Sequence, residues 1–164
     1  MAADNLYAIA LGSNRRSRHG SPEATVRAAA EALGVERLSP IHRTEAMGPA
    51  GRGFANAAAI LDCDLDPPSL LDRLKQTERA FGRRAGRRWG PRVLDLDIIL
   101  WSGGAWGGGG LVVPHPEFRR RAFVLKPLAE IAADWRDPLT GATVRQLLHR
   151  LRRPRPVDPT GPRP

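Results

Sequence analysis

RWGPRVLDLDIIL, residues 88–100, is the stretch that decides how the rest of this chain is arranged. Its second half alternates as a β-strand does, with successive side chains on opposite faces. One face would be wholly apolar and would pack on a core; it carries Leu94, Leu96, Ile98 and Leu100. The other face would present Asp95 and Asp97 side by side, about 6–7 Å apart at their Cα atoms. The pattern therefore predicts a half-buried strand with two neighbouring carboxylates.

Two adjacent acids on a core strand are costly unless another charge offsets theirs. Ligands that are all oxygen suit Mg²⁺, and a run of arginines suits phosphate. Arg87, Arg88 and Arg92 lie directly before the carboxylates, so the first interpretation is a site for a magnesium nucleotide. The alternative is a solvated edge strand whose arginines serve only solubility. Either half of the pattern alone would favour that alternative, whereas the two halves in one short window favour the nucleotide site.

The bulk composition narrows the class of protein. A chain of 164 residues with 41% hydrophobic residues suits one globular domain, expected over residues 1–151, followed by a Pro-rich, disordered tail over 152–164. The net charge of +9 favours anionic ligands. All Lys and Arg residues except Lys75 and Lys126 are arginine, however, which indicates that a nucleotide bias of the coding genome contributes to the charge. Only local clusters of arginine are therefore taken as a sign of an anion-binding site. A single cysteine, Cys63, and the lack of a signal peptide or long apolar segment predict a cytoplasmic protein that does not enter a membrane.

Turn and capping residues divide the chain into elements. Ser21-Pro22 and Asp66-Pro67 are cap-and-proline starts of helices, which Gly34 and Gly82 would end. Apolar runs predict strands over residues 6–11, 35–44, 54–61 and 93–101. Residues 102–110 are expected to be a flexible glycine-rich connection. A short strand over 111–113 and helical segments over 117–121, 124–133 and 143–151 would follow.

The order strand, helix, strand, strand, helix, strand over residues 6–101 is that of the split βαβ, or ferredoxin-like, fold. The predicted class is therefore α+β, an antiparallel sheet with helices on one face, plus a C-terminal extension. The other face would be open. A site on that face would combine Asn56 from the third strand with Asp95 and Asp97 from the fourth.

The chain also resembles a known family, 6-hydroxymethyl-7,8-dihydropterin pyrophosphokinase of folate biosynthesis. The resemblance covers roughly residues 6–150 and depends on ALGSN (10–14), FANAA (54–58), RWGPRVLDLD (88–97), VPHP (113–116) and RAF (121–123). It implies transfer of the β,γ-diphosphate of ATP to the hydroxymethyl group of the pterin, with release of AMP. The implied partners are thus ATP and the pterin, acted on by a monomeric enzyme that binds neither nucleic acid nor membrane.

The resemblance also implies roles for individual residues. Asp95 and Asp97 would hold two Mg²⁺ ions and, with Arg83 and Arg92, would form the catalytic set. The ATP-binding positions would be Glu78, Trp89, Arg92, Ile98, His115 and Arg121. The pterin-binding positions would be Thr44, Met47, Phe54, Asn56, Asp95 and Phe123, with the two phenylalanines stacking on the two faces of the ring.

Two rival functions use the same residues. A basic RNA-binding module of ferredoxin-like fold would explain the charge, but such sheets display several stacking aromatics, and only 5% of this chain is aromatic. A two-metal nuclease would use Asp95 and Asp97, but the sequence offers no third acidic ligand nearby. Salt-dependent RNA binding or Mg²⁺-dependent cleavage of nucleic acid would favour these rivals.

Overall fold

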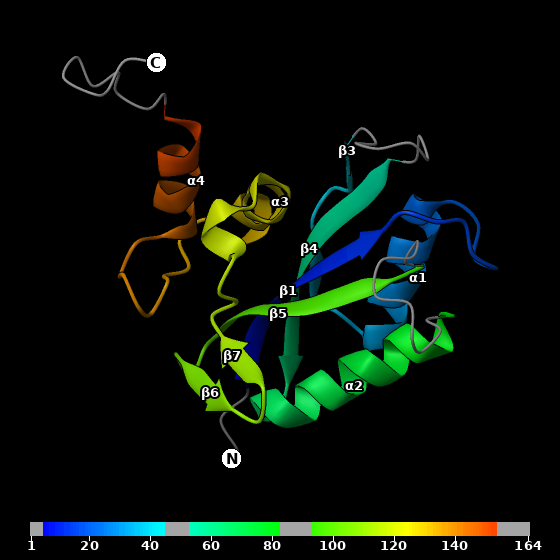
Figure 1. Cartoon of the computed structure of the whole chain (residues 1–164), viewed down its shortest axis with the longest axis horizontal. Coiled ribbons are helices and arrows are strands. Elements are labelled where there is room, and N and C mark those ends of the chain that lie inside the picture. The colour runs from blue at the N-terminus through cyan, green and yellow to red at the C-terminus, as the bar shows by residue number, and fades with distance from the viewer. Residues whose placement is uncertain (1–4, 45–52, 83–92, 154–164) are drawn as a thin grey trace, which may run out of the picture.

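The computed structural model describes residues 5–44, 53–82 and 93–153. Within these residues the main sheet contains β1 (Asn5–Ser13), β2 (Arg37–Leu38), β3 (His42–Thr44), β4 (Phe54–Cys63) and β5 (Asp95–Trp101). The order across the sheet is β2-β4-β1-β5, with β3 also paired to β4, and every pairing is antiparallel. The predicted mixed α and β architecture with an antiparallel sheet is therefore confirmed (Figure 1).

The helices between these strands begin where the sequence predicts. α1 (Pro22–Leu33) is capped by the Ser21 hydroxyl, which accepts the Ala24 amide at 3.2 Å. α2 (Pro67–Ala80) is capped by Asp66, whose carboxylate accepts the Ser69 amide at 2.9 Å. Each cap satisfies an amide that has no partner within the helix, and the proline that follows has no amide to lose.

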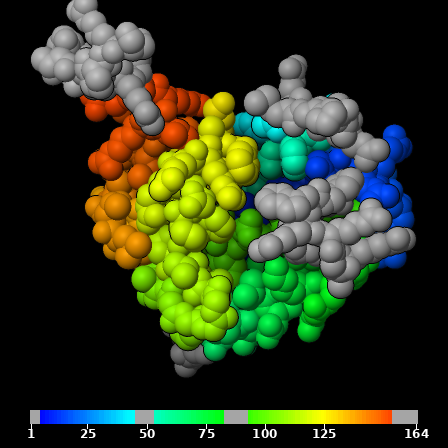
Figure 2. Space-filling model, viewed as in Figure 1, coloured from blue at the N-terminus to red at the C-terminus, as the bar shows by residue number. Residues whose placement is uncertain are grey.

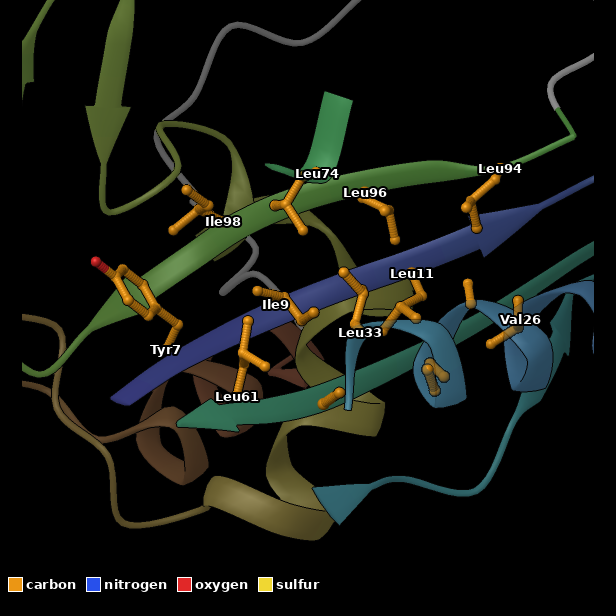
Figure 3. Close-up of a cluster of buried hydrophobic side chains, with 14 of the residues drawn as sticks. Tyr7, Ile9, Leu11, Val26, Leu33, Leu61, Leu74, Leu94, Leu96 and Ile98 are labelled. Carbon is orange, nitrogen blue, oxygen red and sulfur yellow. The ribbon is translucent and has the colours of Figure 1, made fainter. Parts of the chain in front are cut away.

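The first apolar cluster fills the space between the sheet and these two helices (Figure 3). Alternate side chains of β1 point into it, and they meet Leu94, directly before β5, and Leu96 of β5. Val26 and Leu33 of α1 and Leu74 of α2 close the cluster from the helix side. This half of the fold follows directly from the strand and helix periodicities.

The second face of the sheet is partly covered, so the prediction that this face is open is wrong for the covered part. A second apolar cluster joins Ala58 and Ile60 of β4 to the C-terminal segments. Those segments are η1 (Phe118–Arg120), α3 (Ala122–Ala132) and α4 (Val144–Arg152). Figure 2 shows the orange and red residues around α4 gathered beside the yellow α3. The C-terminal extension is thus a third layer, because the sheet is apolar on this face too.

Local irregularities explain the other departures from prediction. A β-bulge shifts the pairing of β1 with β5, so that Leu100 joins the second cluster instead of the face it was expected to share with Ile98. The predicted strand 35–44 is split into β2 and β3 around Pro40, which cannot donate to the ladder. The glycine-rich segment is not simply a connection, since β6 (Trp106–Gly108) and β7 (Leu111–Val113) form an antiparallel hairpin there.

The C-terminal helix begins where a helical segment was predicted, and Thr143 and Gln146 form a reciprocal capping box at its start. The tail lies outside the described residues from position 154, so the domain boundary near 151 stays a prediction. No helix in the described part of the chain is both long and apolar enough to cross a membrane.

Candidate active site

A cavity of about 650 Å³ opens on the second face of the sheet, beside α3. Its floor comes from the ends of β1, β4 and β5, and Phe123 and Val124 at the start of α3 contribute a wall. It brings together predicted residues from four segments of the chain: Thr44, Phe54, Asn56, Asp95, Asp97, Arg121 and Phe123. Most of the predicted site residues that the structure describes therefore share one connected surface.

The register of the sheet explains why the polar side chains meet. Gly12, in the central strand β1, pairs with Asn56 of β4 on one side and with Asp95 of β5 on the other. Directly paired residues of an antiparallel sheet share a face. Asn56 and Asp95 therefore face the cavity from the two sides of a glycine, and Asp97 follows two residues along β5.

The two carboxylates have the electrostatics of a cation site. Burial, and then the neighbouring charge of Asp95, raise the pKa of Asp97, while His115, Arg121 and Lys75 act in the opposite direction. Carboxylate oxygens on one face of a strand fit Mg²⁺, which takes one or two protein carboxylates and completes its shell with phosphate and water. The described residues contain no cluster of three or more His, Cys, Asp or Glu, so a metal held here would need such outside ligands.

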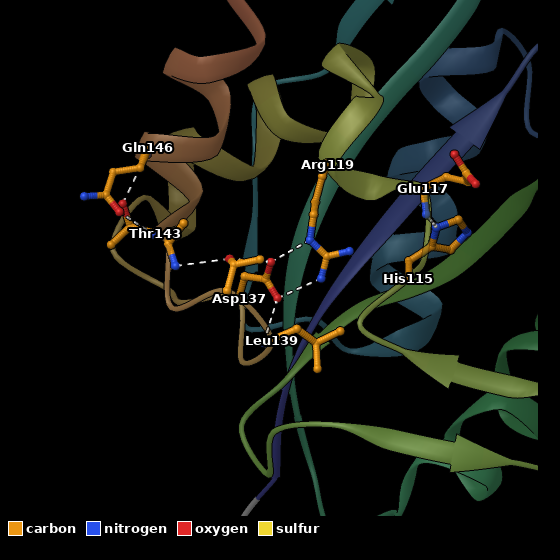
Figure 4. A network of polar contacts seen from close by, with 9 residues as sticks. His115, Glu117, Arg119, Asp137, Leu139, Thr143 and Gln146 are labelled. Carbon is orange, nitrogen blue, oxygen red and sulfur yellow. Dashed lines mark hydrogen bonds and ion pairs between the residues drawn. The ribbon is translucent and has the colours of Figure 1, made fainter.

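His115 lies beside the outer edge of β5. Its backbone amide donates to the Ile99 carbonyl at 3.0 Å, and its Nδ1 accepts the Glu117 amide at 3.1 Å (Figure 4). Burial lowers the pKa of the ring, against the raising effect of Asp97. The neutral imidazole with Nδ1 as acceptor carries its proton on Nε2, so Nε2 is a donor.

Aromatic rings and a cation line the mouth of the cavity. Phe54 and Phe123 are 44% and 43% exposed, which is unusual for phenylalanine and leaves ring surface available to a ligand. The Arg121 guanidinium carbon lies 5.7 Å from the centre of the Phe123 ring, within range of a cation–π contact. Asn56, by contrast, is only 8% exposed and forms part of the floor.

Three of the predicted ATP-binding residues that the structure describes do not line this cavity: Glu78, Ile98 and His115. Glu78 of α2 is 1% exposed, and its Oε2 accepts the Leu96 amide at 2.8 Å, which ties α2 to β5. Lys75 lies 3.6 Å from the other carboxylate oxygen of Glu78. Ile98 packs in the first apolar cluster, on the opposite side of the sheet. Four further predicted residues lie outside the described residues: Met47, Arg83, Trp89 and Arg92.

Some cavity residues were not assigned a role from sequence. Gly12, Ser13 and Asn14 line the cavity at the end of β1, and Ser13 is 1% exposed. The available signal was a Gly-Ser-Asn turn directly after a buried strand, but its place beside Asn56 depends on strand order. Lys75 does not line the cavity and was also given no role from sequence, although its charge acts to lower the pKa of Asp97.

Comparison with known proteins gives one consistent family. The family model described as 7,8-dihydro-6-hydroxymethylpterin-pyrophosphokinase (HPPK) matches residues 8–133. Proteins named 2-amino-4-hydroxy-6-hydroxymethyldihydropteridine pyrophosphokinase are 39% identical in Methylorubrum extorquens, over 93% of this chain and 94% of the relative, and 42% identical in Pseudomonas aeruginosa, over 79% and 82%. A Synechocystis relative is 44% identical over 71% of this chain, but the match spans only 60% of the relative.

Solved structures agree on the fold. The Plasmodium falciparum HPPK-DHPS wild-type crystal structure has a TM-score of 0.70 at 12% sequence identity. The alignment covers 90% of this chain and 41% of the Plasmodium chain, so this chain matches less than half of that protein. At this identity the likeness shows a shared fold and no more.

Proposed function

Because the chain belongs to the 7,8-dihydro-6-hydroxymethylpterin-pyrophosphokinase family, we propose that it transfers the diphosphate of ATP to the hydroxyl of 6-hydroxymethyl-7,8-dihydropterin in folate biosynthesis, giving the pterin diphosphate and AMP. The observation that carries this proposal is the single cavity in which paired aspartates lie beside two exposed phenylalanines and a buried asparagine. Paired carboxylates suit a metal-bound polyphosphate, and the aromatic and amide groups suit a flat polar heterocycle.

The pterin half of the site is proposed to include Thr44, Phe54, Asn56, Asp95 and Phe123. The two exposed phenyl rings supply stacking faces for the bicyclic ring. The Asn56 amide offers a donor and an acceptor together, which a pyrimidine edge needs in one plane. The ring would thus be held at both faces and along one edge, with its hydroxymethyl group directed toward the aspartates.

The nucleotide half is proposed to lie at the edge of β5. Asp95 and Asp97 would hold two Mg²⁺ ions, whose charge would neutralise the phosphate oxygens and favour attack at phosphorus. Arg121, on the cavity wall, would add a fixed positive charge toward the phosphates, and His115 would donate from Nε2. Ion pairing at these positions raises the local concentration of an anionic substrate and orients it.

In the proposed reaction a bond forms between the pterin hydroxymethyl oxygen and the β-phosphorus of ATP. The bond from that phosphorus to the oxygen bridging the α- and β-phosphates breaks, AMP leaves with the bridging oxygen, and the hydroxyl proton is released to the solvent. The cavity residues hold the two substrates in line. Phe123 and Val124 on the cavity wall would limit the access of water, which would otherwise compete as the nucleophile.

Further assignments rest on the family pattern. Arg83, Arg92 and Trp89 are proposed to act on ATP, and Met47 on the pterin, as in the motif that they match.

The ferredoxin-like classification is supported by the antiparallel order β2-β4-β1-β5 with α1 and α2 on one face. We also propose a cytoplasmic monomer with no nucleic-acid or membrane partner. The nuclease alternative is weaker because no third acidic ligand joins Asp95 and Asp97 among the described residues.

The direct test is AMP formation from MgATP with and without the pterin. We expect AMP only when the hydroxymethyl-dihydropterin is present, and none after chelation of Mg²⁺. AMP formed equally well without the pterin, or cleavage of nucleic acid in its place, would overturn the proposal.

Phe123→Ala tests the pterin half separately. Loss of one stacking face should weaken pterin binding by about 1–3 kcal/mol, the usual value of stacking on one aromatic side chain. The control is Leu139→Ala, because Leu139 is 65% exposed and does not line the cavity. An equal loss of nucleotide affinity in Phe123→Ala would contradict the assignment.

A further inference from the structure

Gly12 lies at the centre of the cavity floor without any role in the assignments above. It pairs with Asn56 on one side and with Asp95 on the other, and all three residues line the cavity. A Cβ placed on Gly12 would lie 3.3 Å from Oδ1 of Asn56 and 3.8 Å from the Ala55 carbonyl oxygen. Any side chain on residue 12 would therefore enter the cavity beside the Asn56 amide.

The backbone does not require glycine here. Gly12 is not among the described glycines with positive φ, and it lies in a regular, paired part of β1. Glycine in a central strand is unfavourable, because it loses more conformational freedom and has no side chain to pack. Neither turn geometry nor strand stability explains the glycine at position 12. The remaining explanation is the space that it leaves in the cavity above β1.

We propose that Gly12 is a specificity-determining residue for the pterin, because its bare backbone lets the edge of a flat ring lie between Asn56 and Asp95. This inference rests on the proposed function and deepens it. The two flanking strands are about 10 Å apart, twice the usual spacing between neighbouring strands. The Asn56 and Asp95 side chains therefore approach a ring from its two sides, in a common layer above Gly12.

The chemistry of the ligand explains why one carbon matters. Hydrogen bonds to a heteroaromatic ring lie near the ring plane, so the ring must sit at the same height above the sheet as the amide and the carboxylate. Any Cβ on Gly12 would lift the ring out of that layer or push the Asn56 amide aside. The nucleotide half is proposed to use Asp95, Asp97, Arg121 and His115, and a Cβ on Gly12 would come within 4 Å of none of them.

The test is Gly12→Ala, with pterin binding measured in the presence of a non-hydrolysable MgATP analogue and the analogue measured alone. We expect pterin affinity to fall about 10- to 100-fold, as for one misplaced carbon in a tight pocket, while affinity for the analogue is unchanged. The matched control is Gly107→Ala in β6, where an added Cβ has nothing within 4 Å. That variant should bind both ligands as the wild type does.

Thermal unfolding separates this role from a structural one. If Gly12 were needed only for folding, alanine would lower the thermal midpoint and weaken both ligands together, which would overturn the inference. Unchanged pterin affinity in a folded Gly12→Ala protein would also overturn it. The AMP assay of the wild-type protein is done before any variant is made. If the wild type forms no AMP with the pterin, the proposed function itself fails.

A second comparison remains informative if Gly12→Ala does not fold. Asn56→Ser removes the 3.3 Å contact, so Gly12→Ala can be added to it without that clash. Lower pterin affinity in the double variant than in Asn56→Ser supports the inference. Equal affinity in the two contradicts it.

Discussion

Asp97 lies where burial and a neighbouring carboxylate both oppose its charge, and its pKa is raised accordingly. A carboxyl whose pKa is higher in the folded than in the unfolded protein costs stability once the pH rises above its unfolded value, 3.8, and the cost is complete above the folded value. A bound cation would offset this cost. The cation-binding role proposed for Asp97 would thus account for a charge that lowers the stability of the free protein.

Asp97→Asn should therefore raise the thermal midpoint of the metal-free protein at neutral pH while it abolishes AMP formation. Calorimetry in the presence of a chelator measures the first effect, and an AMP assay measures the second. Asp62→Asn, an exposed aspartate on β4, is the control and should change neither. A lower midpoint for Asp97→Asn would show that the charge is already compensated within the chain.

At the scale of elements, one buried ion pair fixes the segment that leads into α3. Arg119 of η1 donates to both oxygens of Asp137, at 2.5 Å and 2.8 Å, and Asp137 is fully buried (Figure 4). The Thr140 hydroxyl and the Leu139 amide also donate to this carboxylate. Burial alone would raise the pKa of Asp137, but these hydrogen bonds outweigh it and lower the pKa to about 2.

Asp137→Asn should destabilise the protein by about 3 kcal/mol at pH 7, because it leaves the Arg119 charge without its partner. The wild-type carboxylate contributes its full stability above pH 3.8 and loses it as the pH falls through about 2. The difference in the free energy of unfolding between Asp137→Asn and the wild type should therefore become smaller as the pH falls from 3.8 to about 2. Urea unfolding at several pH values measures this difference.

Asp134→Asn is the matched control for this prediction. Asp134 also pairs with an arginine, Arg145, but both side chains are exposed, at 82% and 67%. Removing such a surface pair should cost less than about 1 kcal/mol. An equal cost for the two variants would mean that burial is not what makes the Asp137 pair important.

The elements that sequence predicted correctly are those defined by local chemistry. Ser21, Asp66 and Thr143 are side-chain caps, and each begins the expected helix. Leu100 was placed on the wrong face because the bulge in β5 depends on its partner strand. The predicted strand over 111–113 is confirmed as β7, but its partner β6 was missed, because a three-residue strand with two glycines has no recognisable apolar alternation.

At the scale of the whole molecule, the cavity is bounded by two layers that meet only through tertiary packing. β1, β4 and β5 form its floor, while Arg121 and Phe123 come from the C-terminal layer. The strand carboxylates and the asparagine could be predicted from alternation alone. Which face α3 would cover could not, because both faces of the sheet are apolar and nothing local distinguishes them.

A ligand that contacts both layers should stabilise the molecule as a unit. A non-hydrolysable MgATP analogue with the pterin, each at 100 times its dissociation constant, should add about 2.7 kcal/mol per ligand to the free energy of unfolding. Calorimetry with and without a chelator measures how much of this requires the metal. A midpoint that does not move with both ligands present would contradict a shared cavity.

The contribution of α3 to that cavity has a consequence for biosynthesis. A ribosome adds roughly 5–20 residues each second, so several seconds separate the synthesis of Asn56 from that of Phe123. During this interval the apolar face of the nascent sheet around Ala58 and Ile60 is not yet covered by α3. Catalytic competence and protection from aggregation should therefore arrive together, late in translation, when α3 emerges from the exit tunnel.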